Sequence, residues 1–95
     1  MTTIPAAGTL SEADRKALID RLARVEGQLR GVQRMIAEER DCEAIAQQLS
    51  AARGALAKAF TELIACAIEH RMVEEPPAEL HDRLSGILGL LTRYG

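Results

Sequence analysis

The chain has 95 residues and a formal net charge of −2, and 47% of its residues are hydrophobic although only Phe60 and Tyr94 are aromatic. This length suffices for one domain with a thin core, and the sequence holds neither a phosphate-binding loop nor a nucleophile–base–acid constellation, which argues against an enzyme. No apolar run approaches the roughly 20 residues that cross a bilayer, and the N-terminus lacks the features of a signal peptide. We therefore expect a cytoplasmic protein with no membrane partner, whose cysteines stay reduced.

Two regions are expected along the chain. Residues 1–10 contain Pro, Gly and Thr and predict a flexible tail, whereas residues 11–95 predict a single helical domain. A first long helix is expected from about Ser11 to Glu39, because Ser11 followed by Asp14 is a variant of the helix-capping pattern. Its apolar residues recur at alternating spacings of four and three, which is a heptad-like seam. The seam consists of Leu18, Leu22, Val25, Leu29, Val32 and Ile36.

A second long helix is expected after a polar break at residues 38–41, with Asp41 as its N-cap. It continues to about Val73, because the Glu-Glu-Pro-Pro segment that follows must end it. Pro77 then fits the first turn of a third, shorter helix. The second helix repeats the alternating spacing with Ile45, Leu49, Ala52, Leu56, Ala59, Leu63, Cys66 and His70, and the third has an apolar face of Leu80, Leu84, Ile87, Leu88 and Leu91.

These elements predict an all-α fold with two long helices and one short helix in each chain. A single chain would leave much of both apolar seams in water, which is unfavourable. Two chains can cover the seams by pairing their long helices in an antiparallel four-helix bundle, with the third helices packed outside. We therefore expect a homodimer.

Basic residues are concentrated in the first helix. From Arg15 to Arg34 the chain has six basic and two acidic residues, so a local positive face can exist on an acidic protein. Charge alone does not distinguish a nucleic-acid-binding face from an ordinary solvent-exposed one. Its candidate members are Arg21, Arg24 and Gln28 along one edge of the seam, Lys16 and Arg34 on the outer side, and Arg53 and Lys58 on the second helix.

The segment RLARVEGQLRGVQRMIAEERDC, from Arg21 to Cys42, resembles the signature of the CsoR/RcnR/FrmR family of bacterial repressors. The segment QQLSAARGAL, from Gln47 to Leu56, resembles the second helix of the same family. The resemblance implies an all-α homodimer that assembles further into a tetramer, as a dimer of dimers, and represses transcription until an inducer binds. It also implies that the basic positions of the first two helices contact operator DNA, through phosphates and DNA shape because no helix-turn-helix or zinc finger is present.

Members of this family differ in the inducer, which is Cu(I), nickel or cobalt, formaldehyde, or reactive sulfur species. Cys42 matches the first ligand of the copper sensors, but Ala67 and Arg71 stand where their second and third ligands are expected. The histidines of the nickel and cobalt sensors are absent, and Arg71 replaces the second cysteine of the sulfur sensors. The N-terminal proline of the formaldehyde sensors is also missing, since Pro5 is internal.

The chain offers a different set of ligands, Cys42, Cys66 and His70. Cys66 and His70 are four residues apart and share a helix face. Cys42 lies at the other end of the same helix, about 36 Å away at 1.5 Å per residue, so the three residues can meet only between two antiparallel chains. Two thiolates and an imidazole suit Cu(I) or another soft metal, and they suit Zn(II) if a fourth ligand is present.

Other interpretations of these residues stay open. Cys42 can react with a polysulfide or an electrophile such as formaldehyde, and Cys66 can then act as the resolving thiol. Alternatively, Cys66 is a packed core residue, and His70 only interacts with the dipole at the end of its helix. His81 is expected on the surface. A helical interaction module without DNA binding is the remaining alternative for the whole chain.

Overall fold

The computed structural model describes residues 8–74 and 77–95, and for residues 70–74 and 77–78 it describes the backbone only. Three α-helices make up the described part. They are α1 (Glu12–Ala37), α2 (Cys42–Glu74) and α3 (Pro77–Tyr94).

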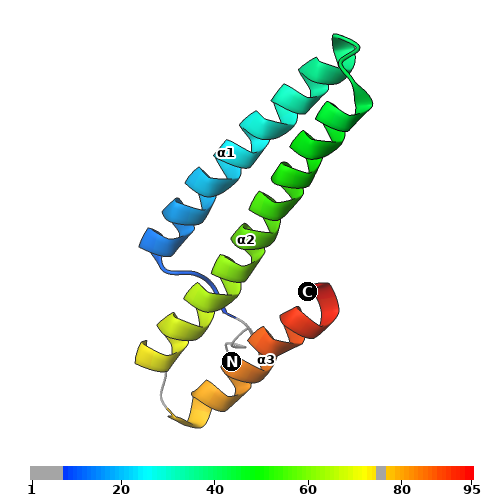
Figure 1. The fold of residues 1–95 in the computed structure, drawn as a ribbon. Coiled ribbons are helices and arrows are strands. Elements are labelled where there is room, and N and C mark those ends of the chain that lie inside the picture. The colour runs from blue at the N-terminus through cyan, green and yellow to red at the C-terminus, as the bar shows by residue number, and fades with distance from the viewer. Residues whose placement is uncertain (1–7, 75–76) are drawn as a thin grey trace.

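The helices form an elongated arrangement with extents of 56 × 25 × 23 Å. Helices α1 and α2 form an antiparallel hairpin, and α3 folds back beside the C-terminal part of α2 (Figure 1). Within the described residues all regular structure is helical, which confirms the predicted all-α class with two long helices and one short helix. None of the described helices is long and apolar enough to cross a membrane. The pairing of two chains stays a prediction, and most of the expected tail, residues 1–7, lies outside the described residues.

Local signals in the sequence set the two ends of α1. Ser11 is the N-cap, and its hydroxyl accepts a hydrogen bond of 3.2 Å from the backbone N–H of Asp14, as the capping pattern predicts. At the other end the N–H groups of Glu39 and Arg40 donate to the carbonyls of Ile36 and Met35. This is a Schellman motif, with Glu39 in the left-handed region at φ 55°. The helix therefore ends at Ala37, two residues earlier than the sequence suggested.

The starts of α2 and α3 also follow the sequence. The carboxylate of Asp41 accepts a hydrogen bond of 3.1 Å from the N–H of Glu43, so Asp41 caps α2 as expected. Helix α3 begins at Pro77, whose missing N–H would have no partner in the first turn of a helix. Both ends of α1 and the starts of α2 and α3 therefore have local chemical causes.

The apolar seam of α1 divides into two rows, each with a period of seven residues. Leu18, Val25 and Val32 are buried, with 4–7% of their surface exposed. These side chains pack against α2, because α2 is the helix that α1 contacts. The alternate members of the seam stay in solvent; they are Leu22, Leu29 and Ile36, with exposed fractions of 40%, 43% and 56%.

The seam of α2 divides in the same way. Ala52 and Ala59 are buried, whereas Leu49 and Leu56 are about half exposed, at 46% and 52%. Small residues on the inward row allow α1 and α2 to approach closely, and the larger leucines of the other row remain uncovered. One chain therefore leaves much of the apolar surface of the two seams exposed.

Helix α3 packs on α2 through a narrow strip. Ile87 is fully buried and anchors this contact. Three other apolar or aromatic residues of α3 stay exposed; they are Leu88, Leu91 and Tyr94. Helix α3 therefore covers the end of α2 that extends past α1 (Figure 1), and it leaves the exposed rows of the hairpin open.

Candidate functional site

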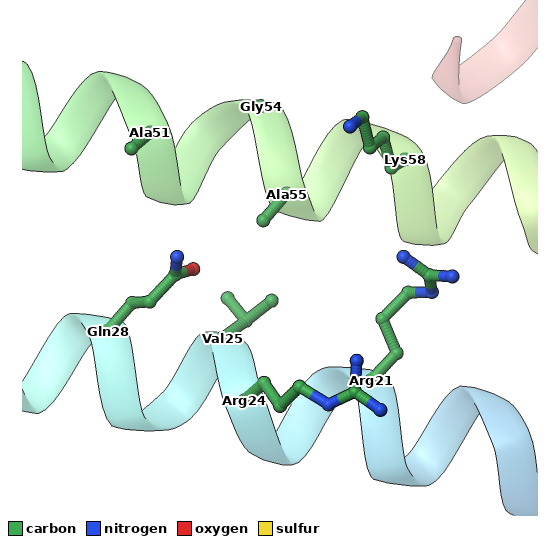
Figure 2. Close-up of a pocket in the computed structure, with 8 residues that line it drawn as sticks. All are labelled: Arg21, Arg24, Val25, Gln28, Ala51, Gly54, Ala55 and Lys58. Atoms are coloured by element: carbon green, nitrogen blue, oxygen red, sulfur yellow. The ribbon is translucent and has the colours of Figure 1, made fainter.

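A basic cleft runs along one side of the contact between α1 and α2. Arg21, Arg24 and Gln28 line it from α1, and Lys58 lines it from α2. Its volume is about 390 Å³, and Val25, Ala51, Gly54 and Ala55 complete the lining. In Figure 2 the side chains of Arg21 and Gln28 extend from α1 toward α2.

Helix geometry explains why these residues gather. Residues at spacings of three, four and seven share one face of a helix, which places Arg21, Arg24 and Gln28 together on α1. The facing turns of α2 carry small side chains, and these leave room for the long polar ones. A second groove continues the cleft along α2; it is lined by Arg21, Ala57, Lys58, Thr61, Glu62 and Ala65. Arg21 and Lys58 belong to both grooves and therefore stand at the centre of the basic surface.

The remaining basic residues predicted to contact DNA lie outside the cleft. Lys16 is 80% exposed near the start of α1 and forms an ion pair of 3.1 Å with Asp20. Arg34 is exposed in the last turn of α1. Arg53 lines a separate groove with Ala46, Leu49 and Ser50. The fold thus brings together four of the seven predicted residues.

Glu62 is part of the basic surface and was not anticipated from the sequence. Its Oε2 forms an ion pair with Nε of Arg21, with 30% of the Glu62 side chain and 39% of the Arg21 side chain exposed. This contact joins α2 to α1 at the centre of the basic surface. The sequence gives no signal for it, because the pairing depends on how the two helices are aligned across the turn.

The two thiols occupy different environments, and both cysteines are free. Cys42 is exposed at the first residue of α2. Cys66 is half-buried, and its thiol interacts with Asp14 of α1 in the same chain. Burial raises the pKa of the Cys66 thiol, and the negative charges of Asp14, Glu62 and Glu69 raise it further. Cys66 is therefore a protonated thiol at neutral pH, whereas Cys42 is accessible from solvent.

The predicted ligands do not meet within one chain. Cys42 and Cys66 lie at opposite ends of the continuous helix α2, about 36 Å apart at 1.5 Å per residue. The side chain of His70 lies outside the described residues. Among the side chains that the structure describes, no three His, Cys, Asp or Glu residues are grouped to hold a metal ion. A metal site that includes Cys42 needs ligands from a second chain or from residues that are not described.

Comparison with known proteins finds a matching protein family and several similar proteins. Over residues 14–93 the chain matches the protein family described as metal-sensitive transcriptional repressor. It is similar to the transcriptional repressor RcnR of Citrobacter koseri, with 30% identity over 82 residues that make up 85% of this chain and 91% of the relative. RcnR of Salmonella typhimurium and an RcnR homolog of Salmonella typhi match with the same identity and coverage. No solved structure matches the chain.

The environment of Cys66 can be tested by thiol alkylation. In a Cys42→Ser background, where Cys66 is the remaining thiol, Asp14→Asn removes a negative charge beside the sulfur. The pKa of Cys66 then falls toward its ordinary value, the thiolate fraction at neutral pH rises, and the rate of alkylation by iodoacetamide rises several-fold. Glu12→Gln, which removes a charge from the same turn of α1, is the matched control. An unchanged or slower reaction of the Asp14→Asn variant contradicts this assignment.

Proposed function

This chain belongs to the family of metal-sensitive transcriptional repressors, and on that premise we propose that it represses transcription by binding operator DNA until an inducer releases it. The observation that carries the proposal is the basic cleft, which Arg21, Arg24 and Lys58 line from two helices of a chain whose net charge is negative. Cations held on adjacent helix turns suit a duplex, because phosphates repeat at short intervals along its backbone. In this proposal Gln28 supplies a hydrogen bond beside the three cations.

The DNA surface requires a second copy of the chain on the other side of the hairpin. On a helix, successive residues point about 100° apart, so Arg21 and Leu22 fall on opposite sides of the buried row that contains Val25. Leu22 lines an apolar groove of about 420 Å³ together with Leu18, Ile19, Leu56, Ala59, Phe60, Leu63, Leu10 and Arg15. A patch of this kind suits a protein partner. We assign it to an antiparallel copy, which completes a four-helix bundle and leaves both basic clefts outside; a tetramer forms from two such dimers.

The inducer site in this proposal lies between chains and is centred on Cys42. Antiparallel pairing brings Cys42 of one chain toward the partner's end of α2, where Cys66 and His70 are located. A soft metal such as Cu(I) fits two sulfurs and one imidazole. Because the pKa of Cys66 is raised, the metal must displace a proton from it, and its affinity for the site should increase with pH.

Thiol chemistry at Cys42 is the second candidate, and one observation favours it. Cys42 is exposed at the start of α2, whereas Cys66 is held as a protonated thiol by burial and acidic neighbours. Cys42 is therefore the better nucleophile toward a reactive sulfur species or formaldehyde, and Cys66 acts afterwards or not at all. The chemistry then modifies sulfur and needs no metal.

Release from DNA requires that the inducer bind two forms of the protein unequally. Coupling free energies between sites are typically about 1–3 kcal/mol, which corresponds to a loss of DNA affinity of roughly 5- to 150-fold. Each inducer site would contact two hairpins, so a shift of one hairpin against the other changes the spacing of the basic clefts. A duplex with fixed phosphate spacing then fits only one of the two forms.

The DNA surface is tested by removing one cation from the cleft and one from elsewhere. We expect Arg24→Ala to weaken binding to a fluorescent duplex, selected from a randomised pool by the wild-type protein, about tenfold and to flatten the dependence of affinity on salt. Arg40→Ala removes the same charge from the turn, where Arg40 lies 3.6 Å from Glu38, and should leave affinity nearly unchanged. Equal losses in both variants would mean that net charge, rather than the cleft, binds DNA.

The inducer is tested by a DNA-release assay with three added species: Cu(I), polysulfide and formaldehyde. The wild type is compared with Cys42→Ala, Cys66→Ala and His70→Ala. Loss of the copper response in all three variants supports the metal site. A polysulfide response that needs both cysteines but not His70 supports sulfur chemistry, and a formaldehyde response that needs Cys42 alone supports an electrophile sensor. If Cys42→Ala still releases DNA like the wild type, the proposed site is wrong.

A further inference from the structure

We propose that Glu62 is a positioning residue of the DNA-binding surface, and that it holds Arg21 ready for phosphate before DNA arrives. The inference rests on the proposed function and names a residue that the basic cleft alone does not suggest. Glu62 is negatively charged, so by charge alone it is expected to repel the phosphates of DNA. The geometry of its contact with Arg21 points to the opposite role.

The contact engages the inner nitrogen of the guanidinium. Oε2 of Glu62 pairs with Nε of Arg21. A guanidinium has five N–H donors, of which Nε supplies one and the two terminal nitrogens supply four. A carboxylate at Nε therefore fixes the plane of the group while the terminal donors remain available for phosphate oxygens.

The ion pair between Glu62 and Arg21 is also partly shielded from water. Oε2 of Glu62 is shielded from water, and among the described residues it accepts no hydrogen bond of ordinary geometry, so its charge is balanced by Arg21 through the ion pair. Ion pairs that are partly removed from water are screened less by salt than exposed pairs are. The interaction therefore persists under conditions that weaken exposed pairs such as Lys16–Asp20.

Pre-ordering matters for a side chain as long as arginine. A free arginine loses much rotamer entropy when it binds a phosphate, and a side chain that is already held loses less. In Figure 2 the guanidinium of Arg21 reaches from α1 toward α2, on the same part of the cleft as Lys58. Glu62 follows Lys58 by one helical turn and lines the second groove but not the first cleft, whereas Arg21 and Lys58 line both. A phosphate in the first cleft can therefore contact Arg21 and Lys58 without meeting the carboxylate directly.

The alternative role of Glu62 is to neutralise Arg21 and repel DNA. The two roles predict opposite results for Glu62→Ala, because loss of a positioning residue weakens DNA binding and loss of a competing carboxylate strengthens it. They also differ for Glu62→Gln. Glutamine loses the charge but keeps an oxygen that can accept a hydrogen bond from Nε, so it preserves more of the affinity than alanine does if positioning is the role.

The test is a double-mutant cycle on Arg21 and Glu62, read by the anisotropy of the same pool-selected duplex. We expect Glu62→Ala to weaken binding about tenfold, and to cause no further loss in the Arg21→Ala background, because its effect acts through Arg21. The slope of affinity against salt should fall alike in Glu62→Ala and Arg21→Ala. Glu69→Ala, which removes an exposed carboxylate from the same helix, is the matched control.

The outcomes separate this inference from the proposed function. Tighter binding by Glu62→Ala, or an equal loss with and without Arg21, overturns the positioning role while DNA binding itself stands. If the wild-type protein selects no duplex, the proposed function fails and the inference fails with it. Circular dichroism of each variant, with the helical content of the wild type expected, shows that a loss of binding comes from the side chain and not from unfolding.

Discussion

Two helices packed side by side can cover only the parts that face each other, and in this hairpin one row of each apolar seam stays largely in solvent. Leu22 and Leu29 on α1 and Leu56 on α2 are between 40% and 52% exposed, although their neighbours in the seam are buried. Burying a fully exposed leucine is worth about 1.5–3 kcal/mol, and these side chains have about half of that burial left to gain, so together the exposed rows favour association. The same division places the basic cleft on the opposite side of the buried row, where the proposed antiparallel pairing would leave it free.

The position of Cys66 follows from this division. It continues the inward row of Ala52 and Ala59 at a spacing of seven, and it meets Asp14 at the start of α1 in its own chain. Burial and acidic neighbours raise the pKa of the Cys66 thiol, whereas Cys42 is exposed at the far end of α2. One helix thus carries two thiols of different character, and only the exposed thiol is ready to meet an incoming species.

The sequence alone predicted the helices and most of their ends, because these depend on local signals. The hydroxyl of Ser11, the carboxylate of Asp41 and the presence of proline at position 77 act within one turn, and each marks a boundary that the structure confirms. The contacts between helices were not predicted. The pairs Arg21–Glu62 and Cys66–Asp14 depend on the alignment of α1 with α2, which the turn around Glu39 sets, and neither residue of such a pair shows its partner in the sequence. Charge alone likewise could not separate Arg21, Arg24 and Lys58, which share the cleft, from the basic residues that do not.

Antiparallel pairing of two chains is the central claim, and a distance between the two copies of Cys42 tests it most directly. Spin labels are attached to Cys42 in a Cys66→Ala variant, and the separation of the labels is measured by double electron–electron resonance. Antiparallel α2 helices place the two labels near opposite ends of the bundle, at about 36 Å or more given 1.5 Å per residue. A separation below about 20 Å, as parallel helices of this diameter would give, or a monomer with no dipolar signal, would contradict the account.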